Sequence, residues 1–214
     1  MSTTALLIRH AHVDAIGRRL VGRLPGINLS ERGLAEVERL RRNFAVPVEA
    51  IYSSPLERAR QTAAPLAADR KFDPVTLDGL TEVDFGDWTG LSFKELDRLP
   101  AWHEFNTRRS LARVPNGESA AQVQTRILGV LEQLAQRHTG ETFAIVSHAD
   151  VIRAAVLHYL AIPLDDFQRV QIDTASVTAV NLMKTPQLVV VNHLERIDAS
   201  TISSRGASLA IVCR

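Results

Sequence analysis

Short apolar runs alternate with amphipathic helical segments along most of the chain, a pattern typical of α/β proteins. Residues 5–8 and 143–146 are continuously apolar, which indicates strands buried on both faces of a sheet. A further strand is expected to end near Tyr52, and residues 177–183 and 187–194 predict an antiparallel hairpin. The pattern therefore predicts a three-layer α/β/α sandwich with a mixed, mostly parallel central sheet and a C-terminal antiparallel hairpin.

Apolar residues at helical spacing predict the helices between these strands. The first such face is formed by Leu34, Val37, Leu40 and Phe44. A capping box from Ser54 to Glu57, with Pro55 at the first helical position, predicts a second helix that Pro65 should kink or shorten. A longer helix is expected from Ser119, and its apolar face is formed by Val123, Ile127, Val130, Leu131 and Leu134.

We expect a single domain over residues 1–214. Residues 78–118 are mixed and loop-rich, with a short helix signal at Ser92, and residues 85–118 are expected to form a lid over the site. The tail over residues 197–214 has no clear pattern, and the sequence does not place it.

Composition narrows the classes of function. The 214 residues are 45% hydrophobic and carry a net charge of +1, which argues against a broad nucleic-acid or membrane footprint. The single cysteine, Cys213, forms no internal disulfide and fits a reducing compartment. Because no signal peptide or membrane-spanning run stands out, we expect a cytoplasmic protein, and the sequence leaves a homodimer open.

Polar side chains follow two of the predicted buried strands. Arg9 and His10 come directly after the first strand, and His148 comes just after the strand over residues 143–146. Parallel strands end at one edge of a sheet, where open α/β sheets bind ligands. Arg58 lies one turn into the second helix, so its side chain can lean back over the same crevice. Two arginines, two histidines and a helix N-terminus are therefore expected together.

Such a collection of positive charge suits a dianion, most naturally a phosphate. The chain has no P-loop motif and no clear carboxylate pair for Mg²⁺, so no metal and no cofactor are expected. A neutral imidazole can attack phosphorus, and the leaving alkoxide then needs a proton. Spacing alone does not choose the proton donor among Glu82, Asp84 and Asp87. A metal pair of His10 with His12 is the weaker alternative, because Arg9 would repel a cation.

Six segments occur in the order seen in the histidine phosphatase superfamily, also called phosphoglycerate mutase-like, and the resemblance covers roughly residues 4–195. The segments are "LLIRHA", "GRLPGINLSERG", "IYSSPLERARQTA", "TEVDFGDWTG", "PNGES" and "IVSHADVIRA". The resemblance implies that His10 is the phosphorylated nucleophile. It also implies that Arg9, Arg58 and His148 form the phosphate pocket and that Glu82 is the proton donor.

The chain departs from the usual motifs after each of the two histidines, and again where His12, Val13 and Ile16 stand in place of the usual Glu-Thr and a later asparagine. Ala11 replaces the glycine that usually follows the first histidine, and Ala149 stands in the corresponding place after His148. Alanine keeps its backbone N–H, so Ala149 is still expected to contact substrate. Arg23 and Arg109 are further candidate substrate contacts, the latter because an Arg-Arg-Ser run resembles one that helps hold substrate in the mutases. A solvated loop or helix face is the alternative for both.

The segment "EVDFG" at Glu82 resembles the phosphatase-type members, whereas full mutases carry a block similar to "ERHYG". We therefore expect a histidine acid-type phosphatase that hydrolyses a small-molecule phosphomonoester through a phosphohistidine. The alternatives are a phosphoglycerate mutase and, in a different class, a catalytically silent phosphate-binding regulatory protein. The sequence does not identify the natural substrate.

Overall fold

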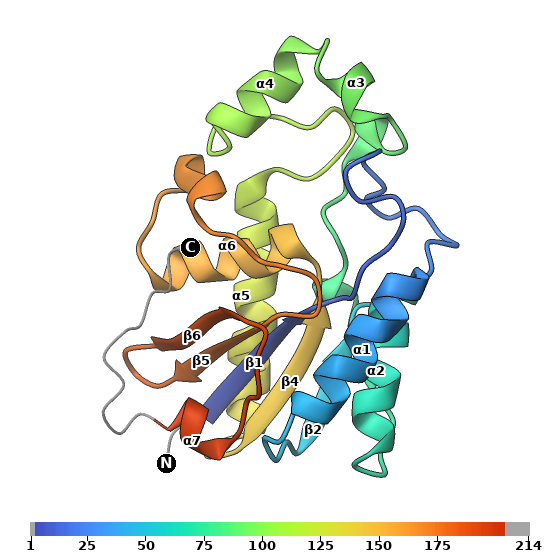
Figure 1. Cartoon of the computed structure of the whole chain (residues 1–214). Coiled ribbons are helices and arrows are strands. Elements are labelled where there is room, and N and C mark those ends of the chain that lie inside the picture. Colours follow the sequence, from blue (N-terminus) through green and yellow to red (C-terminus); the bar gives the residue numbers. More distant parts are fainter. Residues whose placement is uncertain (1–2, 204–214) are drawn as a thin grey trace.

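The computed structural model describes residues 3–203, which form a six-stranded sheet between two layers of helices (Figure 1). The strands are β1 (Thr3–Arg9), β2 (Ala50–Ser53), β3 (Val75–Thr76), β4 (Thr142–Ser147), β5 (Val177–Leu182) and β6 (Gln187–His193). Their order across the sheet is β3-β2-β4-β1-β5-β6. The first four strands pair in parallel, whereas β5 and β6 are antiparallel to their neighbours. The expected mixed sheet with a C-terminal hairpin is confirmed.

Two separate cores cover the two faces of the sheet. The main helices are α1 (Glu31–Asn43), α2 (Glu57–Ala68), α5 (Ala120–Arg137) and α6 (Ala149–Tyr159). Leu6 and Ile8 of β1 pack in the core beside α1 and α2, whereas Ala5 and Leu7 pack in the core beside α5 and α6. Because successive side chains of a strand point to opposite faces, this central strand is apolar at every position from 5 to 8.

The predicted apolar face of α1 is wrong at its first residue. Leu34 is 60% exposed, whereas the other three residues of that face are buried. The first turn instead approaches the rest of the protein through Gly33, where a Cβ would lie 2.1 Å from the carbonyl oxygen of His12. This backbone contact turns the following side chain toward solvent.

The predicted start of α2 is also wrong in its details. Leu56 is the N-cap of α2 and provides no side-chain cap, so Ser54 does not cap the helix. The Ser54 hydroxyl instead bonds to the N-cap residue of α6. Pro65 lies inside α2, which continues for three residues beyond it and ends at Ala68.

Residues 78–118 form short helices joined by loops, and a capping box at Ser92 confirms the short helix signal there. Ser119, directly after this region, is the N-cap of α5 and also forms a capping box. These short helices are η1 (Asp78–Leu80), η2 (Gly86–Trp88), α3 (Phe93–Leu96) and α4 (Pro100–Thr107). Trp102 of α4 packs against Trp88 and Phe105, with ring centroids 5.6 and 5.8 Å away. In Figure 1, α3 and α4 stand on the side of the sheet where β1 and β4 end.

The chain after β6 returns to the sheet's α1 side. Ile197 forms a parallel bridge with Phe44, and a last short helix, α7 (Ala199–Ile202), is capped by Asp198. This places the first part of the segment that the sequence left unplaced. Residues 204–214, with Cys213, lie outside the described residues. Within residues 3–203, no helix is both long enough and apolar enough to cross a membrane.

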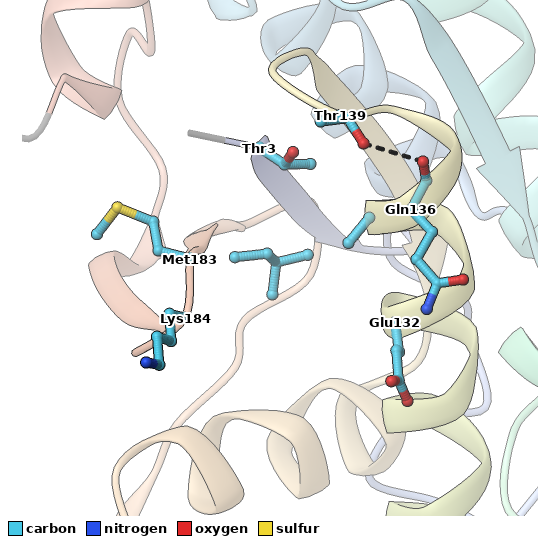
Figure 2. Close-up of a pocket in the computed structure, with 8 residues that line it drawn as sticks. Thr3, Glu132, Gln136, Thr139, Met183 and Lys184 are labelled. Carbon is cyan, nitrogen blue, oxygen red and sulfur yellow. Dashed lines mark hydrogen bonds between the residues drawn. The ribbon is translucent and has the colours of Figure 1, made fainter. Parts of the chain in front are cut away.

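An open groove of about 620 Å³ lies where β1 begins, at the opposite end of that strand from Arg9 (Figure 2). It is lined by Thr3, Glu132, Ala135, Gln136, Thr139, Leu182, Met183 and Lys184. Its walls contain neither histidine nor arginine. The groove therefore lacks the anion-binding chemistry that the sequence predicts.

Candidate active site

The structure brings the two strand-end histidines together. Arg9 pairs with Ser147 in the parallel ladder between β1 and β4, so the next residues, His10 and His148, leave the sheet side by side. Their ring centroids lie 5.1 Å apart, and both side chains are buried. This is the edge beyond the carboxyl ends of the strands at which the sequence places a site.

Arg58 joins the two imidazole rings. Its Nε donates to His10 Nε2 at 3.3 Å, and its Nη2 lies 3.3 Å from His148 Nδ1 and 2.8 Å from the Gly22 carbonyl oxygen. The remaining nitrogen, Nη1, is buried and has no partner among the described residues. A buried donor without an acceptor is costly, so this nitrogen suits an anionic ligand.

The surroundings of His10 determine which ring nitrogen carries the proton. A guanidinium only donates hydrogen bonds, so His10 Nε2 must present a lone pair to Arg58. Nδ1 lies 2.7 Å from the Ala11 carbonyl oxygen, which only accepts, so the proton is on Nδ1. Burial and the charges of Arg58 and Arg9 hold the pKa of His10 well below its usual value. His10 is therefore neutral, with Nε2 available as a nucleophile.

His148 has the opposite arrangement. Its Nδ1 faces the donor-only Arg58 and therefore carries the lone pair, so the proton is on Nε2, which lies 2.8 Å from the Ser54 hydroxyl. Burial and then the charge of Arg58 hold the pKa of His148 well below its usual value. Ser54 Oγ also accepts from the backbone N–H of Leu56 at 3.3 Å.

Two further positive groups face the same edge. Arg9 donates from Nη1 to the Ile172 carbonyl oxygen at 2.6 Å, while its buried Nε has no partner among the described residues. Helix α6 begins at Ala149, so the positive end of its dipole lies next to His148. By contrast, the N–H of Ala11 is already donated to Thr62 Oγ1 at 3.0 Å.

Glu82 is the carboxyl group nearest the histidines. Its Oε2 lies 3.8 Å from His148 Nδ1, and its Oε1 accepts the Val83 N–H at 2.9 Å. The side chain is only 14% exposed, and burial, reinforced by the charge of Asp150, raises the pKa of Glu82 to about 7. Near neutral pH this carboxyl can therefore either give or take a proton.

The two competing carboxyls are engaged elsewhere. Asp84 accepts the backbone N–H of Gly86 at 3.0 Å, and Asp87 accepts both of its hydrogen bonds from the Asn116 amide. Neither has a contact with His10 or His148. The geometry therefore favours Glu82, a choice that spacing alone leaves open.

A half-buried ionic frame holds the backbone at Glu82. The Glu82 carbonyl accepts from Arg23 Nε at 2.8 Å and from Arg126 Nη2 at 3.2 Å. Glu118 bridges these two arginines with contacts of 2.8 and 2.9 Å. Arg23 thus supports the segment that carries Glu82. The sequence places Glu118 in the "PNGES" segment but gives it no role. It does not identify Arg126, which lies on α5 among the residues outside the apolar face.

Arg109 lies in a buried cluster beside the site. Its guanidinium is stacked between the rings of Phe105 and Phe167, 4.2 and 3.7 Å from their centroids, and it bonds to Asp150 at 3.1 Å. Arg153 bonds to the other oxygen of Asp150, also at 3.1 Å. Burial alone would raise the pKa of Asp150, but these arginines outweigh it and lower that pKa. The solvated-face alternative for Arg109 is therefore wrong, because only 5% of the residue is exposed.

His12 and His10 have different hydrogen-bond partners and do not form the metal-binding pair considered from the sequence. Its Nδ1 contacts the Ser30 hydroxyl at 2.8 Å, and its backbone N–H is donated to Glu36. Across residues 3–203, no three histidine, cysteine, aspartate or glutamate side chains cluster in a way that could hold a metal ion.

The site combines two buried histidines, an arginine between them and a carboxyl group with a raised pKa. At the carboxyl edge of a mixed sheet, this combination is typical of phosphoryl-transfer enzymes. The chain belongs to the histidine phosphatase superfamily (branch 1), whose family model matches residues 5–193. The family expectation from the sequence is confirmed.

Some of the relatives that the chain matches are phosphoserine phosphatases. The chain is 30% identical over 183 residues to phosphoserine phosphatase 1 of Hydrogenobacter thermophilus, covering 83% of this chain and 85% of that protein. It is 35% identical over 166 residues to a metal-independent phosphoserine phosphatase of Arabidopsis thaliana, covering 72% and 68% of the two chains. Among solved structures, Bacillus stearothermophilus YhfR superimposes with a TM-score of 0.82 at 29% identity, covering 94% of this chain and all of that one.

Proposed function

We propose that this protein is a phosphomonoester hydrolase that works through a phosphohistidine at His10. The observation that carries this proposal is the tautomer of His10, whose Nε2 lone pair accepts from Arg58 Nε. Arg58 and Arg9 each keep one further buried donor, Nη1 and Nε, without a partner among the described residues. A neutral nucleophile in a pocket of cations suits attack on a dianion. The phosphatase relatives support the same class of reaction.

In the first step, Arg9, Arg58 and the N-terminus of α6 bind the phosphoryl oxygens. His10 Nε2 attacks phosphorus, and the bond from phosphorus to the substrate oxygen breaks. The protonated Glu82 gives its proton to the departing oxygen, so the alcohol leaves neutral. When Arg58 Nη2 turns from His148 Nδ1 to the bound dianion, Nδ1 takes up a proton from solvent, and the resulting imidazolium stabilises the developing charge.

In the second step, water attacks the phosphorus of the phosphohistidine. Glu82, now a carboxylate, takes a proton from this water as the oxygen–phosphorus bond forms and the nitrogen–phosphorus bond breaks. His10 returns to its neutral form, and inorganic phosphate leaves. Both steps use one carboxyl group, which requires a pKa close to the working pH.

The substrate is a small phosphorylated metabolite, and phosphoserine is the first candidate because two relatives are phosphoserine phosphatases. In this proposal the chain acts as a single domain, and residues 85–118 cover the bound substrate. The N–H of Ala149 contacts the phosphoryl group, and Arg23 and Arg109 contact the rest of the substrate. A nucleic-acid partner is not expected, and a homodimer stays an open prediction.

The test measures turnover of p-nitrophenyl phosphate and phosphoserine, with and without EDTA, and traps acid-labile phosphohistidine. Wild type should hydrolyse both esters without a need for metal, and His10→Ala should lose both turnover and labelling. His158→Ala is the matched control, because that histidine is exposed on α6. Wild type without turnover and without acid-labile phosphate would contradict the proposal.

Two further outcomes would change the reaction class. With 3-phosphoglycerate and 2,3-bisphosphoglycerate, interconversion faster than phosphate release would replace the hydrolase by a mutase. Tight phosphate binding without any turnover would instead favour the catalytically silent regulatory protein.

A further inference from the structure

The guanidinium of Arg9 is held by a loop outside the catalytic motifs. Residues 170–176 connect η3 (Leu164–Arg169) to β5 and cross the end of β1. Backbone hydrogen bonds join this loop to Arg9, from Arg9 N–H to the Ser176 carbonyl at 3.2 Å and from Ala175 N–H to the Arg9 carbonyl at 3.1 Å. The side chain is fixed separately, by the 2.6 Å bond from Nη1 to the Ile172 carbonyl. The orientation of this carbonyl therefore sets the orientation of Arg9.

Asn192 of β6 holds the other side of the same peptide group. Its Oδ1 accepts the backbone N–H of Asp173 at 2.6 Å, and its Nδ2 donates to Asp173 Oδ2 at 2.9 Å. The N–H of Asp173 and the carbonyl of Ile172 belong to one planar peptide unit. Fixing the N–H therefore fixes the direction of the carbonyl, and the chain of contacts runs from Asn192 through one peptide group to Arg9.

The backbone at Asn192 is shaped for this contact. Its φ is +56°, in the left-handed region that asparagine tolerates better than most residues, and its N–H is donated to Thr178 Oγ1 at 3.2 Å. The pairing of β5 with β6 is irregular between Val177 and Val180. Such irregularities re-aim side chains at functional sites.

We propose that Asn192 is a positioning residue for the phosphate clamp Arg9. The inference rests on the proposed function in giving Arg9 a phosphoryl ligand, whereas the structural link from Asn192 to Arg9 does not depend on turnover. It assigns a role to the antiparallel hairpin, which otherwise carries none of the proposed catalytic groups.

The first variant is Asn192→Gly, which permits the positive φ and removes the whole side chain with its amide. We expect kcat/KM and the affinity for vanadate each to fall about tenfold, because a hydrogen bond to a charged group loses its orientation. Asn181→Ala on β5 is the matched control. That buried asparagine accepts from Thr4 and has no contact with Arg9, so its loss should lower the melting temperature without weakening vanadate binding.

A swap of the two side chains tests the contact itself. Asn192→Asp places a second carboxylate beside Asp173 and should weaken vanadate binding at least as much as Asn192→Gly. Adding Asp173→Asn restores one donor and one carboxylate across the pair, so the double variant should recover most of the lost affinity. In an Arg9→Ala background, Asn192→Gly should cost no further activity.

A readout independent of turnover separates the two proposals. The NMR signals of the Arg9 guanidinium are assigned by their absence from Arg9→Lys. In wild type, its two Nη nitrogens should give separate signals, because the bond to the Ile172 carbonyl holds Nη1. In Asn192→Gly these signals should merge. Unchanged Arg9 signals and unchanged vanadate affinity would overturn the role of Asn192 and leave the hydrolase proposal intact. A wild type that neither binds vanadate nor turns over would overturn the hydrolase proposal, while the Arg9 signals still decide the link.

Discussion

His10 and His148 follow neighbouring parallel strands and contact the same arginine, yet they present opposite ring nitrogens to it. Both are buried, and Arg58 donates to Nε2 of one ring and approaches Nδ1 of the other. The remaining nitrogens have different partners, the Ala11 carbonyl for His10 and the Ser54 hydroxyl for His148.

The difference teaches that the partner of the second nitrogen separates two similar histidines. A backbone carbonyl only accepts, so His10 is held with a proton on Nδ1. The ring cannot lose this proton without losing its hydrogen bond to the Ala11 carbonyl. Ser54 Oγ accepts the Nε2–H of His148 in both protonation states, because the ring gains its second proton at Nδ1, which lies 3.8 Å from Glu82 Oε2. The first arrangement suits a nucleophile, and the second suits a group that gains charge when substrate binds.

The largest effects should come from removing each ring in turn. His10→Ala should lower kcat by at least about 10⁴-fold and abolish acid-labile phosphate, because the nucleophile is gone. His148→Ala should slow phosphohistidine formation by about 10²–10³-fold, the usual cost of losing one group that stabilises transition-state charge, but should still form it. Rapid-quench single turnovers measure both. Labelling that survives in His10→Ala and disappears in His148→Ala would reverse the two roles.

The next effect concerns the proton donor. The pKa of Glu82 is raised to about 7, so the carboxyl is protonated below this pH and loses its proton above it. For phosphoserine, kcat/KM should therefore fall as pH rises through about 7. Glu82→Gln should remove this fall and lower kcat/KM by about 10²–10⁴-fold. The loss should be much smaller for p-nitrophenyl phosphate, whose leaving group needs little protonation.

Asp84→Asn is the control for this profile, because Asp84 bonds to the backbone of Gly86 and lies in the same segment. Its pH profile should match that of wild type. A decline above pH 7 that persists in Glu82→Gln and vanishes in Asp84→Asn would transfer the acid role.

Sequence patterns were sufficient for features that depend on local burial. The continuous apolar runs before Arg9 and Ser147 predict central strands because both faces of such strands lose water. Parallel pairing then brings their ends together, so His10 and His148 could be predicted as neighbours. The capping boxes at Ser92 and Ser119 were also readable, since both partners lie three residues apart in the chain.

Features that depend on distant partners were not readable. Ser54 satisfies the local pattern of a helix cap, but its hydroxyl bonds to His148, 94 residues away. The Arg126 and Asn192 side chains contact Glu82 and Asp173 across 44 and 19 residues. A polar residue carries no periodic signal that identifies such a partner, so a single sequence does not distinguish these residues from solvated ones.

Ser54→Ala tests the partner of His148. The buried Nε2–H of His148 would lose its acceptor, a loss that costs about 1–3 kcal/mol in comparable cases. We expect kcat to fall about tenfold and the nitrogen spectrum of the ring to show a growing share of the Nδ1–H tautomer. Ser53→Ala is the control, because that buried hydroxyl donates to the Ser54 carbonyl and does not contact the histidine. An unchanged tautomer in Ser54→Ala would contradict the role given to the hydroxyl.

The smallest effect should come from Thr62→Val, which removes the hydroxyl that accepts the Ala11 N–H and itself donates to the Arg58 carbonyl. The Ala11 carbonyl, which holds His10, remains in place, so kcat should fall only about twofold to threefold, while an unpaired N–H lowers stability by about 1–3 kcal/mol. Thr125→Val on α5 loses the same kind of hydroxyl bond to its own helix without touching Ala11 and serves as the control. A loss of kcat as large as that of Ser54→Ala would mean that both tautomers depend equally on α2 and its preceding loop. The contrast between a backbone-held nucleophile and a hydroxyl-held partner would then fail.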